Sequence, residues 1–189
     1  MLKNIVKRSR SYRRFNEKRK IPRRVLCRLI ELARFSPCAS NQQALKFMLS
    51  CSSEKNELIF PALSWAGYLK GWKGPKEGER PAAYIVILGD TRISRDFGLD
   101  HGIAAQSILL GAAEKRLGGC MIGSIDRESL RKNLNVPVRY RILLVIALGE
   151  PAERVLLEDV TKKTGTKYYR DRKDIHHVPK RTLEELIVE

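Results

Sequence analysis

Two short runs of apolar residues most constrain what this chain can fold into. They are AAYIVIL at residues 82–88 and RILLVIAL at residues 141–148. The first run lies between Pro81 and Gly89, and the second is followed by Gly149. Each is too short for an ordinary helix, so both predict β-strands without a solvent-facing side. We expect the first strand to lie centrally in a sheet and the second to be buried as well.

Three segments have the spacing of helices. Residues 21–35 place apolar side chains on one face and begin with Pro22, which suits a first helical turn. Residues 99–117 are apolar on every side and rich in glycine and alanine, which is typical of a helix buried in a core or an interface, and Gly118-Gly119 should end it. Asp126 is a suitable N-cap for a third helix at residues 127–134.

The other segments are shorter. Residues 45–51 predict a strand, residues 120–123 an extended segment, and residues 65–78 an irregular one with two tryptophans and several glycines. The end of the chain, Thr182-Leu183-Glu184-Glu185, resembles a capping box that opens a last short helix. Because helices and strands are mixed without a strict β-α-β alternation, we expect an α+β fold and a single domain over residues 1–189.

Composition excludes several classes of protein. The longest apolar runs are well short of the ~20 residues of a membrane-spanning helix, and the basic N-terminus lacks the apolar stretch of a secretory signal. Four scattered cysteines without a C-x-x-C pair argue against a zinc site or a disulfide framework. We therefore expect a cytoplasmic protein that binds no metal.

The formal net charge of +16 raises the alternative of a nucleic-acid-binding protein. Lysines and arginines are, however, spread along the whole chain, and no RNA- or DNA-binding motif organises them. A generally basic surface explains the charge more simply, so a nucleic-acid partner is the less favoured hypothesis.

Two segments could carry chemistry. In residues 8–15, RSRSYRRF, arginines flank two serines, and arginine forks with hydroxyl groups match phosphate oxygens, although a solvated basic arm has the same composition. In residues 36–43, SPCASNQQ, amide side chains follow the end of a helix and could bind the edge of a heteroaromatic ring, although such strings also form ordinary turns.

Taken in order, these segments resemble the nitroreductase family. Its opening pattern R-R-S-x-R-x-F matches residues 9–15, with Ser9 in place of the first arginine, and its A-R-x-x-P-S-x-x-N-x-Q-P-W pattern is similar to residues 33–45, where Ala44-Leu45 replace Pro-Trp. Further similarities follow at DHGIAAQ (100–106), LGGCMIG (117–123, with Met121 for a tryptophan), LGEP (148–151) and KRTLEE (180–185). The resemblance covers nearly the full chain.

The resemblance implies a mostly antiparallel sheet flanked by helices, in an intertwined homodimer whose two sites each draw residues from both chains. It implies bound FMN, which passes electrons from NADH or NADPH to a small acceptor such as a nitroaromatic or a quinone. Alternatives within the wider superfamily are flavin cleavage and dehalogenation. Because the flavin carries the redox chemistry, no catalytic acid or base is assigned, and His101 is interpreted as a surface histidine at a helix end.

The resemblance also implies a set of flavin-binding residues. Those expected at the phosphate and ribityl chain are Arg10, Ser11 and Arg13, with Lys180 or Arg181. Those expected along the ring are Cys38, Ala39, Ser40, Asn41 and Gln43 from one chain, and Met121, Ile122 and Gly123 on the other side. For the aromatic segment at residues 65–78, a lid over the flavin and a filling of the core or dimer contact remain open.

Overall fold

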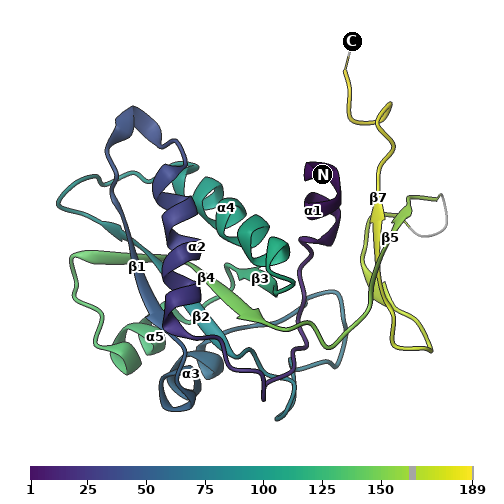
Figure 1. Cartoon of the computed structure of the whole chain (residues 1–189), viewed down its shortest axis with the longest axis horizontal. Helices are drawn as coiled ribbons and strands as arrows, with labels where there is room; N and C mark the ends of the chain where they lie inside the picture. The colour runs from purple at the N-terminus through teal and green to yellow at the C-terminus, as the bar shows by residue number, and fades with distance from the viewer. Residues whose placement is uncertain (162–164, 189) are drawn as a thin grey trace.

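A four-stranded antiparallel sheet forms the middle of the molecule. The structure is a computed structural model, and it describes residues 1–161 and 165–188. The strand order is β1-β2-β4-β3, so the two apolar runs form the two inner strands, as the sequence predicts (Figure 1). The strands are β1 (Leu45–Ser50), β2 (Ala83–Asp90), β3 (Gly118–Ile122) and β4 (Tyr140–Gly149). The α+β class and the antiparallel sheet are thereby confirmed.

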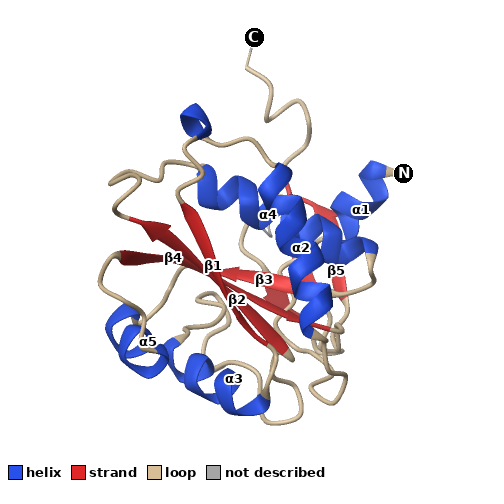
Figure 2. Ribbon diagram, turned by 60° about the vertical axis from the view of Figure 1, so that its left-hand side comes forward, coloured by secondary structure: helices blue, strands red, loops and turns tan. Residues whose placement is uncertain are grey.

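Helices cover both faces of this sheet. Helices α2 (Arg23–Phe35) and α4 (Asp100–Glu114) lie on one face, and α3 (Ser53–Ile59) and α5 (Arg127–Leu134) lie on the other (Figure 2). Side chains of β2 alternate between the two layers: Ile85 packs with α2 and α4, whereas Tyr84 packs on the opposite side. The middle of each inner strand, Ala83–Leu88 and Ile142–Leu148, is apolar on both sides because each side faces a covering layer.

The sequence patterns did not reveal a second, three-stranded sheet near the C-terminus. Its order is β5-β7-β6, with β5 parallel and β6 antiparallel to β7. These strands are β5 (Val155–Asp159), β6 (Tyr169–Arg170) and β7 (His176–Lys180). They are two to five residues long and have at most three consecutive apolar residues, so they lack the longer apolar runs by which a strand is recognised in a sequence. An N-terminal helix, α1 (Leu2–Arg8), was also not anticipated.

One predicted helix end and one predicted helix were wrong. Helix α4 ends at Glu114, and Gly118-Gly119 begin β3 rather than terminating the helix. A Cβ atom at Gly119 would lie 2.5 Å from the Leu109 side chain and 2.8 Å from the Ala147 carbonyl oxygen, so this glycine allows β3 to pack closely. The capping-box hydrogen bonds between Thr182 and Glu185 form in both directions, but they enclose a single turn and not a helix.

The aromatic residues of the 65–78 segment are divided between core and surface. Trp65 is 8% exposed and belongs to the core beneath β2 and β4 on the α3 and α5 side, whereas Tyr68 is 58% exposed. The irregular backbone matches the prediction, and Gly74, at φ +114°, lies against Trp65, where a Cβ atom would come within 2.7 Å. For Trp65, core packing is therefore the correct alternative. Within the described ranges, no helix is long and apolar enough to span a membrane.

Candidate functional site

The basic segment at residues 9–15 lies against the start of β3. Ser11 forms a parallel bridge to Gly119, and the Tyr12 amide donates to the Gly119 carbonyl at 3.0 Å. Phe15 is fully buried and anchors the end of the segment beside Pro151. The segment is therefore part of the fold rather than a solvated arm.

Cys120 follows Gly119, to which Ser11 is bridged, and its thiol donates to the Met121 carbonyl at 3.6 Å. The residue is 4% exposed, and burial raises the pKa of the Cys120 thiol. A thiol kept protonated in this way is a poor nucleophile, so Cys120 acts here through packing.

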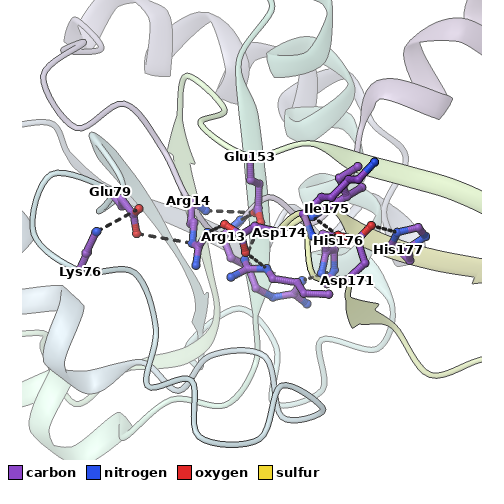
Figure 3. A network of polar contacts seen from close by, with 12 residues as sticks. Arg13, Arg14, Lys76, Glu79, Glu153, Asp171, Asp174, Ile175, His176 and His177 are labelled. Carbon is purple, nitrogen blue, oxygen red and sulfur yellow. Dashed lines mark hydrogen bonds and ion pairs between the residues drawn. The ribbon is translucent and has the colours of Figure 1, made fainter.

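Glu153, two residues before β5 of the second sheet, holds the backbone of the basic segment. Its side chain is 2% exposed, and one carboxylate oxygen accepts a hydrogen bond from the Arg13 amide and a 3.1 Å bond from the Arg14 amide (Figure 3). The other oxygen accepts from Arg170 Nη2 at 2.6 Å. The Trp72 ring contacts both guanidinium groups, at 5.9 Å from Arg14 and 4.7 Å from Arg170.

The Arg13 side chain is held in place through one nitrogen of its guanidinium group, Nη1. Its Nη1 donates to the Ser11 carbonyl at 3.2 Å and lies 3.2 Å from Nε2 of His176 on β7, and its Cζ lies 4.8 Å from the Tyr168 ring centre. His176 is 1% exposed, and burial, reinforced by the Arg13 charge, lowers the pKa of His176 to about 4. The imidazole is therefore neutral at neutral pH.

Arg10 points a different way. Its Nη2 donates to the Val6 carbonyl of α1 at 2.7 Å, and its Nε is buried without a partner in the described part of the chain. Burial lowers the pKa of the Arg10 guanidinium, which is the expected response of a cation that has lost water without gaining a counterion. Such a group is well suited to meet an anionic ligand.

The second predicted segment forms a strained loop after α2. Its centre is a short 3-10 turn, η1 (Ala39–Asn41), and Ser40, Asn41 and Gln43 have φ values of 50°, 51° and 51°. Non-glycine residues adopt this left-handed conformation at a cost, and such strain tends to gather at functional sites. The loop borders a cavity of about 320 Å³ between α2, β1 and α4, which is lined in part by Cys38 and Gln43.

Asp100, at the start of α4, holds this loop. The residue is 7% exposed, and its carboxylate accepts a 2.9 Å hydrogen bond from the Ala39 amide. We expect Asp100→Ala to speed hydrogen exchange at the Ala39 amide by about tenfold or more, because a hydrogen bond to a charged group contributes about 1.5–3 kcal/mol. Nuclear magnetic resonance of the amide measures this, with Asp96→Ala, an exposed aspartate just before α4, as the control. Unchanged protection in Asp100→Ala would refute the role.

The strand register places the two predicted segments at opposite corners of the sheet. Ser11 joins Gly119, which pairs through β4 with Ala83 at the start of β2. The loop instead leads into Leu45, which pairs with Gly89 at the far end of β2. Six residues of strand and three strand intervals separate these corners, about 20 Å along and about 14 Å across the sheet. Within one chain, the two segments therefore do not meet.

The remaining predicted residues fall in two places. Met121 and Ile122 belong to β3 and Gly123 follows it, so these residues lie two to four positions along the chain from Gly119, to which Ser11 is bridged. Lys180 ends β7 and is exposed, and Arg181 pairs with Glu185 at 3.5 Å. Within residues 1–161 and 165–188, neither cation has a hydrogen bond or ion pair with Arg10, Ser11 or Arg13.

Three residues that organise these segments were not among those predicted: Asp100, Glu153 and His176. Asp100 lies in the DHGIAAQ segment, which did draw attention, and Glu153 follows the LGEP segment by two residues. No local pattern distinguishes His176, because its partner Arg13 is 163 residues away in the chain. In the described ranges, no group of three or more histidine, cysteine, aspartate or glutamate side chains could hold a metal ion.

Comparison with protein-family models decides the family. The model described as "Nitroreductase family" matches residues 6–150, which is more than half of the chain. The chain belongs to the nitroreductase family. The predicted resemblance is confirmed, and the matched region of this nitroreductase family member includes the basic segment, the strained loop and the whole four-stranded sheet.

Solved structures share the fold of this nitroreductase family member at low sequence identity. An FMN-dependent nitroreductase of Clostridium difficile is 22% identical, with a TM-score of 0.63 over 79% of this chain and 87% of that one. A nitroreductase family protein of Clostridium novyi is also 22% identical, with a TM-score of 0.66 over 80% and 86%. The NADPH:FMN oxidoreductase of Vibrio harveyi, solved with NAD+, is 23% identical, with a TM-score of 0.62 over 80% and 69%. A search of curated proteins gave no match.

Proposed function

We propose that the protein is an FMN-dependent oxidoreductase that passes electrons from NADH or NADPH through the flavin to a small acceptor such as a nitroaromatic or a quinone. The observation that carries the proposal is the Arg13 guanidinium. Its Nη1 is occupied, while Nε and Nη2 have no hydrogen-bond partner among residues 1–161 and 165–188. Nε and Nη2 form the edge that binds two oxygens of a phosphate at once.

The surrounding residues fit the phosphate end of FMN. Arg10 supplies a second cation with a buried, unpartnered Nε, and Ser11 supplies a hydroxyl next to Gly119. Lys180 and Arg181 are proposed to add positive charge from the end of β7. Met121, Ile122 and Gly123 would border the flavin ring along β3. When bound, FMN supplies the electron transfer itself, and these residues bind and orient it.

We further propose that each flavin site is completed by a second copy of the chain. Cys38, Ala39, Ser40, Asn41 and Gln43 would border the flavin of the partner, because their own chain holds the phosphate site at the opposite corner of the sheet. Apolar side chains on α1, α2, α4 and the C-terminal tail support such a dimer, since they are exposed in a single chain. They include Leu2, Val6, Leu32, Phe35, Leu99, Leu183, Leu186, Ile187 and Val188.

The colour of the purified protein tests the function. We expect a yellow protein with a flavin spectrum that releases FMN on denaturation, and we expect NADH or NADPH to bleach it anaerobically. A colourless protein that added FMN does not convert to a yellow form would contradict the proposal. Bleaching without turnover of nitroaromatic or quinone acceptors would leave the flavin in place and reject these acceptors.

A further inference from the structure

His176 is a buried residue that lies outside every motif of the sequence. It lies on the first position of β7, pairs with Val155 of β5 and Arg170 of β6, and is 1% exposed. Its Nε2 lies 3.2 Å from Nη1 of Arg13, and its ring lies 5.2 Å from that of Tyr168. A histidine in this setting belongs to the environment of Arg13.

The chemistry of the two groups fixes which of them donates. A guanidinium group has five N–H donors and no acceptor, so the contact is a hydrogen bond only if Nε2 of His176 is unprotonated. The ring proton then lies on Nδ1, which is buried and has no partner among the described residues. A neutral imidazole that accepts from Arg13 leaves the full positive charge on the guanidinium, whereas a carboxylate at the same place would compensate it.

The contact also selects a direction for the guanidinium. Arg13 Nη1 carries two hydrogens: one is donated to the Ser11 carbonyl and the other to Nε2 of His176. The Tyr168 ring centre lies 4.8 Å from Cζ of Arg13. With Nη1 held at both hydrogens, the side chain keeps one orientation, and the edge with Nε and Nη2 is the edge left for a ligand. A flexible arginine would lose about 1.5–2 kcal/mol of side-chain entropy on binding, and prior fixation avoids part of that loss.

We propose that His176 is a positioning residue that orients Arg13 toward the phosphate group of the flavin without touching the flavin itself. This inference rests on the proposed function. The inference goes beyond the proposed function because it assigns a specific role to a residue of the second sheet, and so makes that sheet part of the phosphate site. It also makes a prediction specific to the phosphate, since riboflavin has the same ring and ribityl chain but no phosphate.

The test compares the dissociation constants of FMN and riboflavin for the apoprotein, measured by flavin fluorescence. In His176→Ala, we expect the preference for FMN over riboflavin to fall by about tenfold, the size of one hydrogen bond to a charged group. His176→Gln, whose side-chain oxygen can accept in place of Nε2, should retain most of the preference. His177→Ala changes the neighbouring histidine, whose ring bonds Glu158 and Asp171 instead, and should leave the preference unchanged.

A double-mutant cycle separates positioning from general stability. In an Arg13→Met background, His176→Ala should have no further effect on the preference for FMN, because the group it orients is gone. An equal loss of FMN and riboflavin binding in His176→Ala would overturn the inference and assign His176 a structural role. A wild-type protein that binds both flavins equally would overturn the phosphate site, and one that binds neither would overturn the proposed function.

Discussion

Co-expression of two inactive variants should restore flavin-dependent activity. Arg13→Met removes the proposed phosphate contact, and Asn41→Pro disrupts the loop, because proline fixes φ near −65° where Asn41 has φ 51°. If each site takes its phosphate side from one chain and its loop from the other, a mixed dimer has one site with both mutations and one with neither. Each variant alone should be nearly inactive, and random pairing should restore about a quarter of wild-type sites.

The double variant Arg13→Met/Asn41→Pro provides the matched control. When it is co-expressed with wild-type chains, it should inactivate both sites of every mixed dimer, so that about a quarter of all sites stay active. If each site instead came from a single chain, about half would remain and the two single variants would restore nothing. NADH-driven flavin reduction per chain, measured anaerobically, distinguishes these outcomes. Half of the sites remaining with the double variant, and no restoration by the two single variants, would refute the shared site.

Removal of the Glu153 side chain should lower the free energy of unfolding far more than removal of a partly exposed glutamate. Its carboxylate is the acceptor for the amides of Arg13 and Arg14 and for Arg170 Nη2, and its side chain is 2% exposed. Glu153→Ala would leave these donors without their acceptor, and breaking a buried ion pair on one side typically costs about 3–5 kcal/mol. Urea unfolding followed by circular dichroism measures the free energy of unfolding.

Glu158→Ala is the control for that experiment. Glu158 also accepts from a basic side chain, Nδ1 of His177 at 2.8 Å, but its side chain is 25% exposed. Partly exposed pairs contribute about 0–1 kcal/mol, so the loss should be small. The loss in Glu153→Gln should lie between those of Glu153→Ala and Glu158→Ala, because the amide oxygen of glutamine still accepts from the backbone. A Glu153→Ala protein within about 1 kcal/mol of wild type would show that the pair is not needed for stability.

The local patterns predicted those elements that their own residues determine. Strands β2 and β4 each contain a run of consecutive apolar side chains, and α2 and α5 have helical spacing with recognisable ends, so each is visible in a short window of sequence. The same holds for the basic segment and the SPCASNQQ loop, whose composition and order led to the family. The short strands of the second sheet have no such pattern, because they are two to five residues long and combine their apolar residues with charged ones.

The sequence by itself thus determined the family, the antiparallel core and the residues proposed at the flavin. Only the tertiary structure decided how those residues are distributed: the register of β1 to β4 places Ser11 and the loop at opposite corners of the sheet. It also decided what holds Arg13, since Glu153 and His176 lie 140 and 163 residues further along the chain. Contacts at such separations are set by how whole layers pack, and no local pattern of side chains encodes them.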